Sequence, residues 1–88
     1  MSYHLSLSAA RADALFASPL QRSDHPGPGQ VRQAIAAAVA AYGGRGCAAR
    51  VAQSFGDHPE TAVTRMRWAR AMVTDAFGGT QPALACAA

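Results

Sequence analysis

The stretch RVAQSFGDHPETAVTRMRWAR, residues Arg50 to Arg70, decides the fold that we expect for this chain. Its first part has apolar residues at helical spacing and reaches Gly56, and glycine commonly ends a helix because it adopts positive φ at low cost. A second helix is expected to start near Pro59, since proline fits the first turn of a helix. Asp57 and Glu60 have the spacing of a capping box. The stretch therefore predicts two helices joined by a three-residue turn.

The rest of the chain also favours helices. Ala accounts for 22 of the 88 residues, and it is the best helix former. Few runs of Val, Ile or aromatic residues would favour strands. We expect an all-α domain of four helices: Ala9 to Ala17, Gln30 to Tyr42, Cys47 to Phe55 and Pro59 to Phe77.

The expected boundaries of these helices rest on local signals. Ser8 is expected to cap the first helix, and Pro19 to end or kink it. Gln21 to Gly29 contains prolines, glycines and an Asp and predicts a linker, with Pro28 opening the next helix. Gly43 to Gly46 predicts a turn.

Apolar residues recur in these helices at steps of three and four, which is typical of a buried face. In the second helix the expected buried positions are Val31, Ile35, Ala38, Val39 and Tyr42. In the third they are Ala48, Val51, Ala52 and Phe55. In the fourth they are Ala62, Met66, Ala69, Val73 and Phe77.

The length suits one domain. We expect residues 8–77 to form a single helical domain, with residues 1–7 as an N-terminal arm and residues 78–88 as a flexible tail. No basic segment followed by an apolar run marks a signal peptide. The apolar segment Ala34 to Ala41 is too short to span a bilayer. A cytoplasmic protein with no membrane partner is the expectation.

Catalytic and metal-binding patterns are missing from the sequence. Cys47 and Cys86 lie far apart, and no Cys-x-x-Cys pair or Cys/His cluster predicts a zinc site. The acidic residues are scattered, and His4, His25 and His58 have no carboxylate or nucleophile at a spacing typical of catalysis. We therefore expect no enzyme activity, no metal and no cofactor.

The segment from Tyr42 to Val73 resembles region 4 of bacterial sigma factors and the related helix-turn-helix domains of response regulators. Val51-Ala52-x-x-Phe55-Gly56 matches the family's first helix and its end, and Thr61-Ala62 takes its Thr-Val position. Arg65-Met66-Arg67-Trp68-Ala69-Arg70 follows its Arg-Leu-x-Arg-Ala-Arg run, with Trp68 in place of an Arg. The resemblance implies a helix-turn-helix within about residues 47–77, in which Ala52 is small because the two helices cross there.

A helix-turn-helix domain can place its second helix in the major groove of DNA. The leading hypothesis is a small DNA-binding or transcription-associated regulator that forms a dimer. Duplex DNA would be held at phosphates by Arg65, Arg67 and Arg70 and at base edges by Glu60, Val63 and Thr64. The formal net charge of +3 permits nucleic-acid contact without requiring it.

Two features differ from those of a typical DNA-binding helix-turn-helix. Asp57 takes a turn position that the family fills with an apolar residue, and the helix tip carries Glu60 rather than a basic or amide side chain. The alternative hypothesis is a helical interaction module that has lost DNA binding and pairs with itself or a regulatory protein. Its interface would include Trp68 and Met72, together with Leu15 and Phe16 from the first helix. The arginines could equally be a solvated helix face, and Trp68 could belong to the core.

Overall fold

The structure is a computed structural model that describes residues 5–78. It contains three α-helices, α1 (Leu5–Ala17), α2 (Pro28–Asp57) and α3 (Pro59–Val73). A 3₁₀ turn, η2 (Arg22–Asp24), lies between α1 and α2, and a π-helical turn, η3 (Thr74–Gly78), follows α3. No strand occurs between residues 5 and 78, which confirms the all-α class. None of the helices in this range combines the length and hydropathy needed to cross a bilayer.

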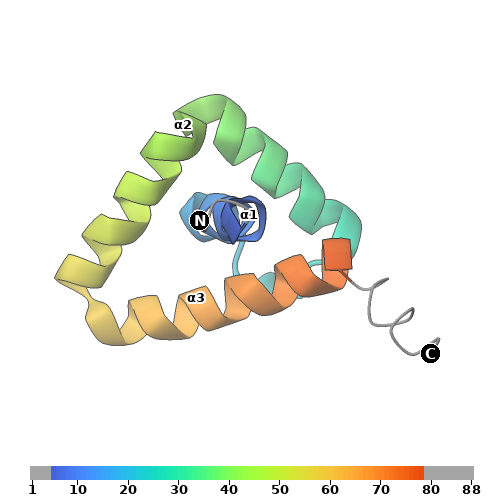
Figure 1. The fold of residues 1–88 in the computed structure, drawn as a ribbon. Coiled ribbons are helices and arrows are strands. Elements are labelled where there is room, and N and C mark those ends of the chain that lie inside the picture. Colours follow the sequence, from blue (N-terminus) through green and yellow to red (C-terminus); the bar gives the residue numbers. More distant parts are fainter. Residues whose placement is uncertain (1–4, 79–88) are drawn as a thin grey trace.

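The helices form a triangle around α1. Seen in Figure 1, the two arms of a bent α2 make two sides, α3 makes the third, and α1 passes through the middle. Eleven residues in the core are buried: Ala12, Ala14, Leu15, Phe16, Val31, Ile35, Ala38, Cys47, Ala62, Ala69 and Val73. Because α1 contributes four of them and is enclosed by the other helices, it is the centre of the hydrophobic core rather than an accessory to it.

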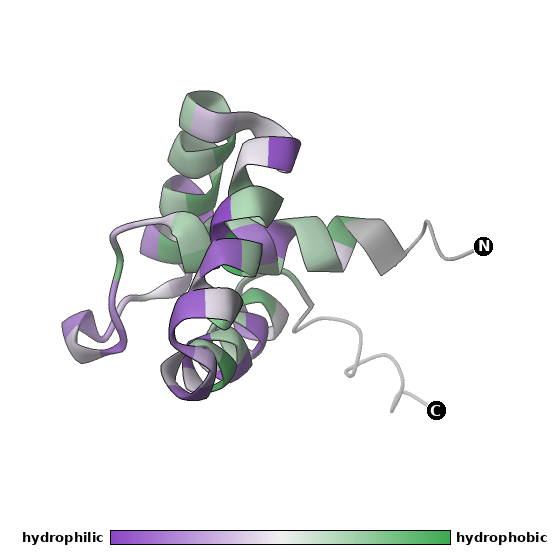
Figure 2. Cartoon of the chain, turned by 90° about the vertical axis from the view of Figure 1, so that its left-hand side faces the viewer, coloured by the Kyte–Doolittle hydropathy of each residue, from purple (hydrophilic) through white to green (hydrophobic). Residues whose placement is uncertain are grey.

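The first helix begins earlier than the sequence predicts. It starts at Leu5, so Ser8 lies inside the helix and does not cap it. Residues 5–7 of the expected arm therefore belong to α1, and residues 1–4 lie outside the described part of the chain. The helix ends at Ala17, as expected from Pro19, since the residue before a proline avoids the α conformation. In Figure 2 the N-terminal turns of α1 extend beyond the triangle.

The bend in α2 involves fewer residues than the expected turn. Gly43 has φ 73° and ψ 169°, and it is the one residue between Pro28 and Asp57 with non-helical angles. Gly44, Arg45 and Gly46, which were expected to form the turn together with Gly43, are helical. A left-handed φ costs glycine little, so a single residue redirects the helix. The four-helix count is not confirmed, because Pro28–Asp57 forms a single element, α2, whose two helical arms meet at the kink at Gly43.

The bend also changes which residues are buried. Val31, Ile35 and Ala38 lie in the core, as predicted, whereas Val39 is 46% exposed and Tyr42 39% exposed. Cys47 is buried instead, at 1% exposure. The buried face of the first arm thus ends at Ala38, before the bend, and burial resumes in the second arm at Cys47.

The corner between α2 and α3 is a single residue, His58, with φ −141° and ψ 70°. Its amide donates to the Ser54 carbonyl at 2.7 Å, and its own carbonyl accepts from the Ala62 amide at 2.9 Å. Pro59 explains the position of the corner, since it forces the preceding residue out of the helical region. Gly56 remains helical, so the turn predicted at that residue is wrong.

These findings do not confirm the helix-turn-helix. The helix-turn-helix motif joins its helices by a turn of three or four residues, and here the turn is one residue. Ala52 is exposed, so no helix crosses it as the resemblance implies. The capping box expected from Asp57 and Glu60 is also absent, because the cap position of α3 is His58 and carries no side-chain capping bond.

Two arginines fasten η3 to the rest of the triangle. The Arg32 guanidinium, near the start of α2, donates to the Ala76 carbonyl at 3.0 Å. The Arg11 guanidinium, on α1, lies 3.9 Å from the centre of the Phe77 ring, a typical cation–π geometry. The end of α3 is thus held to both α1 and the start of α2, which closes the triangle.

Candidate binding groove

Arg65 lies at the centre of the site. Its side chain leaves α3, reaches the end of α1 and donates hydrogen bonds to four main-chain carbonyls. Nε donates to Phe16 at 3.0 Å, and Nη2 donates to Ser18 at 2.8 Å, Leu20 at 3.0 Å and Leu15 at 3.4 Å. The last carbonyls of a helix have no partner within the helix, so Arg65 supplies donors that α1 lacks.

Ser18 completes this end of α1. Its buried hydroxyl donates to the Leu15 carbonyl at 2.7 Å and accepts from the Leu20 amide at 3.2 Å. Every buried side-chain nitrogen and oxygen in the described residues has a hydrogen-bond partner. The C-terminal end of α1 is therefore fixed by one serine and one arginine, and the groove described below is built on a rigid base.

Two aromatic rings flank the Arg65 guanidinium. Its central carbon lies 5.1 Å from the centre of the Trp68 ring and 5.5 Å from that of the Phe16 ring. Phe16 also stacks on Phe55, with ring centres 6.1 Å apart and planes inclined by 22°. Burial lowers the pKa of Arg65. The guanidinium is held by carbonyls and rings, so it is not aimed at a phosphate in solvent.

A groove of about 940 Å³ opens beside this cluster. We call it the η2–α3 groove. The base of the groove, meaning the buried or half-buried part of its lining, includes Phe16, Ser18, Ala62, Arg65 and Trp68. The end of α1, η2, the α2–α3 corner and the first turns of α3 supply the remaining walls, with Gln21, Arg22, Ser23, His25, Ser54, His58, Glu60, Thr61 and Thr64. The groove is within the usual size range of ligand sites in proteins.

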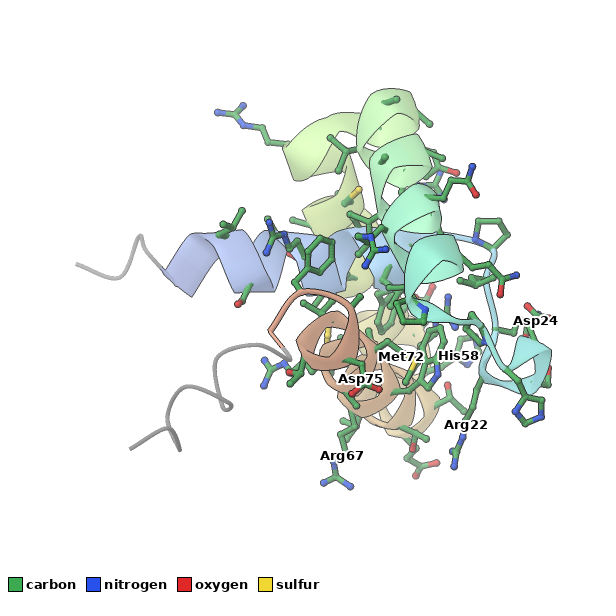
Figure 3. The ribbon with its side chains drawn as sticks, turned by 90° about the vertical axis from the view of Figure 1, so that its right-hand side faces the viewer. Arg22, Asp24, His58, Arg67, Met72 and Asp75 are labelled. Carbon is green, nitrogen blue, oxygen red and sulfur yellow. The ribbon has the colours of Figure 1, made fainter. Side chains whose placement is uncertain are left out.

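The rim of the groove is polar and carries one arginine, one carboxylate and two histidines. Arg22, His25 and His58 are exposed there, against one carboxylate, Glu60. Figure 3 shows Arg22 and His58 on the same side of the molecule as η2. Asp24, between the lining residues Ser23 and His25, does not itself line the groove, and its carboxylate accepts from the Gln21 amide at 2.8 Å. Apart from the Arg65 guanidinium, the lining thus combines aromatic rings at the base of the groove with side chains that can donate hydrogen bonds at its rim.

Five of the six residues predicted to contact DNA recur at steps of three and four along one exposed face of α3, and the sixth, Arg65, lies off that face. Glu60, Val63, Thr64, Arg67 and Arg70 are exposed, whereas Arg65 points inward. In Figure 3 the Arg67 side chain points away from the body of the protein. Glu60 and Asp75 are exposed near the two ends of α3, so the helix presents mixed charge rather than a basic face.

No family model, curated protein or solved structure matches this chain. The resemblance to sigma-factor region 4 therefore stays a prediction.

The predicted protein interface is largely internal. Leu15 is fully buried and Phe16 is 6% exposed, so neither offers a surface in the folded chain. Trp68 and Met72 are half-buried and pack against the core. Of the four, Trp68 alone has both solvent access and a place in the lining of the groove.

Sequence reasoning missed η2 as part of a site. Gln21 to Gly29 was expected to be only a linker, yet Gln21, Arg22, Ser23 and His25 line the groove. The signal available was the Arg and His content of this segment. Between residues 5 and 78 no three His, Cys, Asp or Glu side chains lie together as metal ligands would.

Proposed function

We propose that the protein is a helical interaction module that holds a short segment of another protein in the η2–α3 groove. The observation that carries the proposal is the half-buried Trp68 in the lining of an open groove, beside an arginine that the end of α1 holds in place. Trp and Arg are the residues that most often contribute a large share of binding energy at protein interfaces. A rigid base also reduces the entropy lost when a segment binds.

The homodimer predicted on Trp68, Met72, Leu15 and Phe16 is not part of this proposal. Burial removes Leu15 and Phe16 from the surface, and the part of Trp68 and Met72 that remains exposed is small. A stable dimer needs about 800 Å² of buried surface from each partner. The groove suits an inserted segment better than a second folded copy.

The test is a selection of random-sequence peptides displayed on phage against the folded protein. Enriched peptides are expected to bind the unmodified chain and to lose binding to Thr64→Trp, because an indole at this exposed lining position would occupy the groove without entering the core. Arg67→Ala, one turn further along α3 and outside the lining, is the matched control and should bind as the unmodified chain does. No enriched peptide, or equal binding to Thr64→Trp, would overturn the proposal.

DNA binding remains a second candidate because Arg67 and Arg70 are both exposed on α3. Two phosphate contacts would give weak binding to any duplex that falls with rising salt. Arg67→Ala should then reduce the slope of log affinity against log salt by about one contact. Binding that is absent, or that does not change between low and high salt, excludes this candidate.

A further inference from the structure

We propose that residues 21–26 form a strap that closes over the η2–α3 groove. We call these residues the η2 strap. The inference rests on the proposed function, because the closed strap would retain the segment that the groove binds. It follows from how the strap is attached, from the backbone of one hinge residue and from the charges on the two walls of the groove.

The η2 strap contributes no residue to the core. Residues 21–25 are all exposed, and in Figure 3 the turn that carries Arg22 and Asp24 projects from the side of the molecule. The Asp24 amide donates to the Gln21 carbonyl at 2.9 Å, and the His25 amide donates to the Arg22 carbonyl at 3.1 Å. Segments without buried apolar contacts open at low cost in free energy. Since these hydrogen bonds stay within the strap, it can move as a unit without breaking them.

The residues on either side of the strap are fixed. Before it, the Leu20 carbonyl accepts from Arg65 Nη2 at 3.0 Å, and the Leu20 amide donates to the Ser18 hydroxyl at 3.2 Å. After it, the Gly27 carbonyl accepts from the Val31 amide at 3.0 Å as the cap of α2. Motion is therefore confined to hinges between these two points, and neither helix has to move with the strap.

His25 has the backbone conformation of a hinge residue. Its φ is 49° and its ψ is 54°, and between residues 5 and 78 it is the one non-glycine residue with positive φ. This left-handed conformation is strained for an L-residue. Pro26 follows, and the residue before a proline prefers the extended region. A change of His25 to the extended region would relieve the strain and redirect the strap.

Arg22 and Glu60 indicate where the strap would close. Arg22 lies on the strap and Glu60 in the first turn of α3, and both are exposed in the lining of the same groove. Opposite charges on the two walls attract each other. Asp24 on the strap weakens this attraction, so the pair orients the closed strap rather than driving closure. Closed in this way, the strap would cover Trp68 in the base of the groove.

A disulfide trap tests closure in the free protein. Ser23 on the strap and Thr64 on α3 are exposed lining positions, and the variant combines Ser23→Cys with Thr64→Cys. Cys86→Ser removes the second native cysteine, and Cys47 is buried. A disulfide needs Cα atoms within about 7 Å of each other, so oxidation captures the strap when it approaches α3.

The control pair is Ser23→Cys with Ala71→Cys, because Ala71 is exposed further along α3 and outside the lining. Mass spectrometry of non-reduced digests should show roughly tenfold faster oxidation of the first pair, since proximity raises the effective concentration of the thiols. Equal rates in the two pairs would overturn the inference.

Trp68 reports whether the captured strap covers the groove. It is the one tryptophan of the chain, and it is half-buried in the lining. Acrylamide quenches the fluorescence of an indole that it can reach. The quenching constant should fall when the Ser23→Cys, Thr64→Cys variant is oxidised and recover when it is reduced. A quenching constant that oxidation leaves unchanged would show that the strap does not close over the groove.

The charges on the two walls give a second test. Arg22→Glu in the trap variant should slow oxidation by about threefold, the size expected for a surface ion pair. Adding Glu60→Arg should restore the rate, because the pair is then exchanged rather than lost. Arg45→Glu makes the same change in net charge at an exposed position outside the lining and should leave the rate unchanged. A slow rate that the exchange does not restore would contradict the closing contact.

The failure of this inference is distinguishable from the failure of the proposed function, because the trap and the quenching need no bound segment. If oxidation captures the strap and shields Trp68 but phage selection enriches no peptide, the strap is correct and the proposed function fails. If Thr64→Trp rejects the enriched peptides but the trap forms no faster than its control, the groove binds a segment and the strap is wrong. Circular dichroism of each variant before and after oxidation establishes that the fold is retained.

Discussion

The Arg65 guanidinium donates a 3.0 Å hydrogen bond to the carbonyl of Phe16, which lies 49 residues earlier in the chain. This bond connects α3 to the end of α1 across the middle of the protein. Arg65 therefore stabilises the fold, whereas the sequence pattern predicts that it contacts DNA. This inward orientation places the guanidinium in the lining of the groove and removes it from the exposed face of α3.

Arg65→Ala is expected to destabilise the protein by about 2–4 kcal/mol, because hydrogen bonds to charged groups contribute more than neutral ones and several part-buried carbonyls would lose their donor. Arg65→Lys should recover only part of this loss, since an ammonium cannot reproduce the planar fork. Urea denaturation followed by circular dichroism measures both changes. Arg67→Ala, at an exposed position, should stay within about 0.5 kcal/mol of the unmodified protein. Similar losses at residues 65 and 67 would contradict the assigned role.

Three glycines in and after the bend of α2 are expected to respond differently to the same substitution. Gly43→Ala should destabilise by about 1–3 kcal/mol, because φ of 73° with ψ of 169° is a backbone conformation essentially confined to glycine. Gly44→Ala should stabilise by up to about 1 kcal/mol, because this glycine is helical and a Cβ would meet no atom within 4 Å.

Gly46→Ala is the third member of this series. A Cβ at Gly46 would lie 2.8 Å from the Cβ of Tyr42, a distance that real Cβ atoms do not tolerate. We expect a loss of about 1–3 kcal/mol from this overpacking. Thermal unfolding of the three variants under one set of conditions gives the order, and any order other than Gly44→Ala as the most stable would contradict the described bend.

Val31 and Val39 test which face of α2 is buried. The exposed fraction is 1% for Val31 and 46% for Val39, although the sequence places both on one apolar stripe. Val31→Ala should cost about 2 kcal/mol through lost burial and an unfilled space. Val39→Ala should leave stability within about 0.5 kcal/mol or improve it slightly, since Ala is the better helix former. Equal costs measured by urea denaturation would contradict the difference in burial between these two positions.

Asp13 predicts a pH dependence of stability. Burial raises the pKa of this carboxyl from its usual value of 3.8, and Arg70 offsets part of the rise. The folded state therefore binds the proton more tightly than the unfolded state does. As the pH rises from the usual pKa to the raised pKa, Asp13 ionises more readily in the unfolded state, and the free energy of unfolding falls. Above the raised pKa this loss of stability is complete.

Asp13→Asn removes this titration. The stability of the variant relative to the unmodified protein should increase from about pH 3 toward neutral pH, as the penalty appears in the unmodified protein alone. Arg70→Ala should make the dependence steeper, because it removes the charge that offsets burial. Urea titrations at a series of pH values measure the difference. A difference that is constant, or that decreases with pH, would show that burial does not dominate at Asp13.

Local signals predicted the parts of the fold that depend on neighbouring residues. Pro28 opens α2, Pro19 limits α1, and Val31, Ile35 and Ala38 form a buried stripe. The exact site of each bend could not be read in this way. Several glycines were available after Tyr42, and which one takes a positive φ depends on how both arms pack on α1.

The site was harder to predict because its contacts are distant in sequence. Nothing near Arg65 indicates that its acceptors are carbonyls 45 to 50 residues earlier. The high Ala content adds to the difficulty, because a small apolar side chain is compatible with both faces of a helix. Ala52 and Ala62 look equivalent in sequence, yet the first is exposed and the second is 3% exposed.

The place of α1 inside the triangle has a consequence for synthesis. On the ribosome α1 emerges before every surface that will enclose it, and the donor for its last carbonyls arrives with Arg65 on α3. Until then its apolar face has no complete partner, and contacts between distant segments form slowly. The nascent chain should therefore stay sensitive to proteases until α3 has left the exit tunnel, and then become resistant in one step.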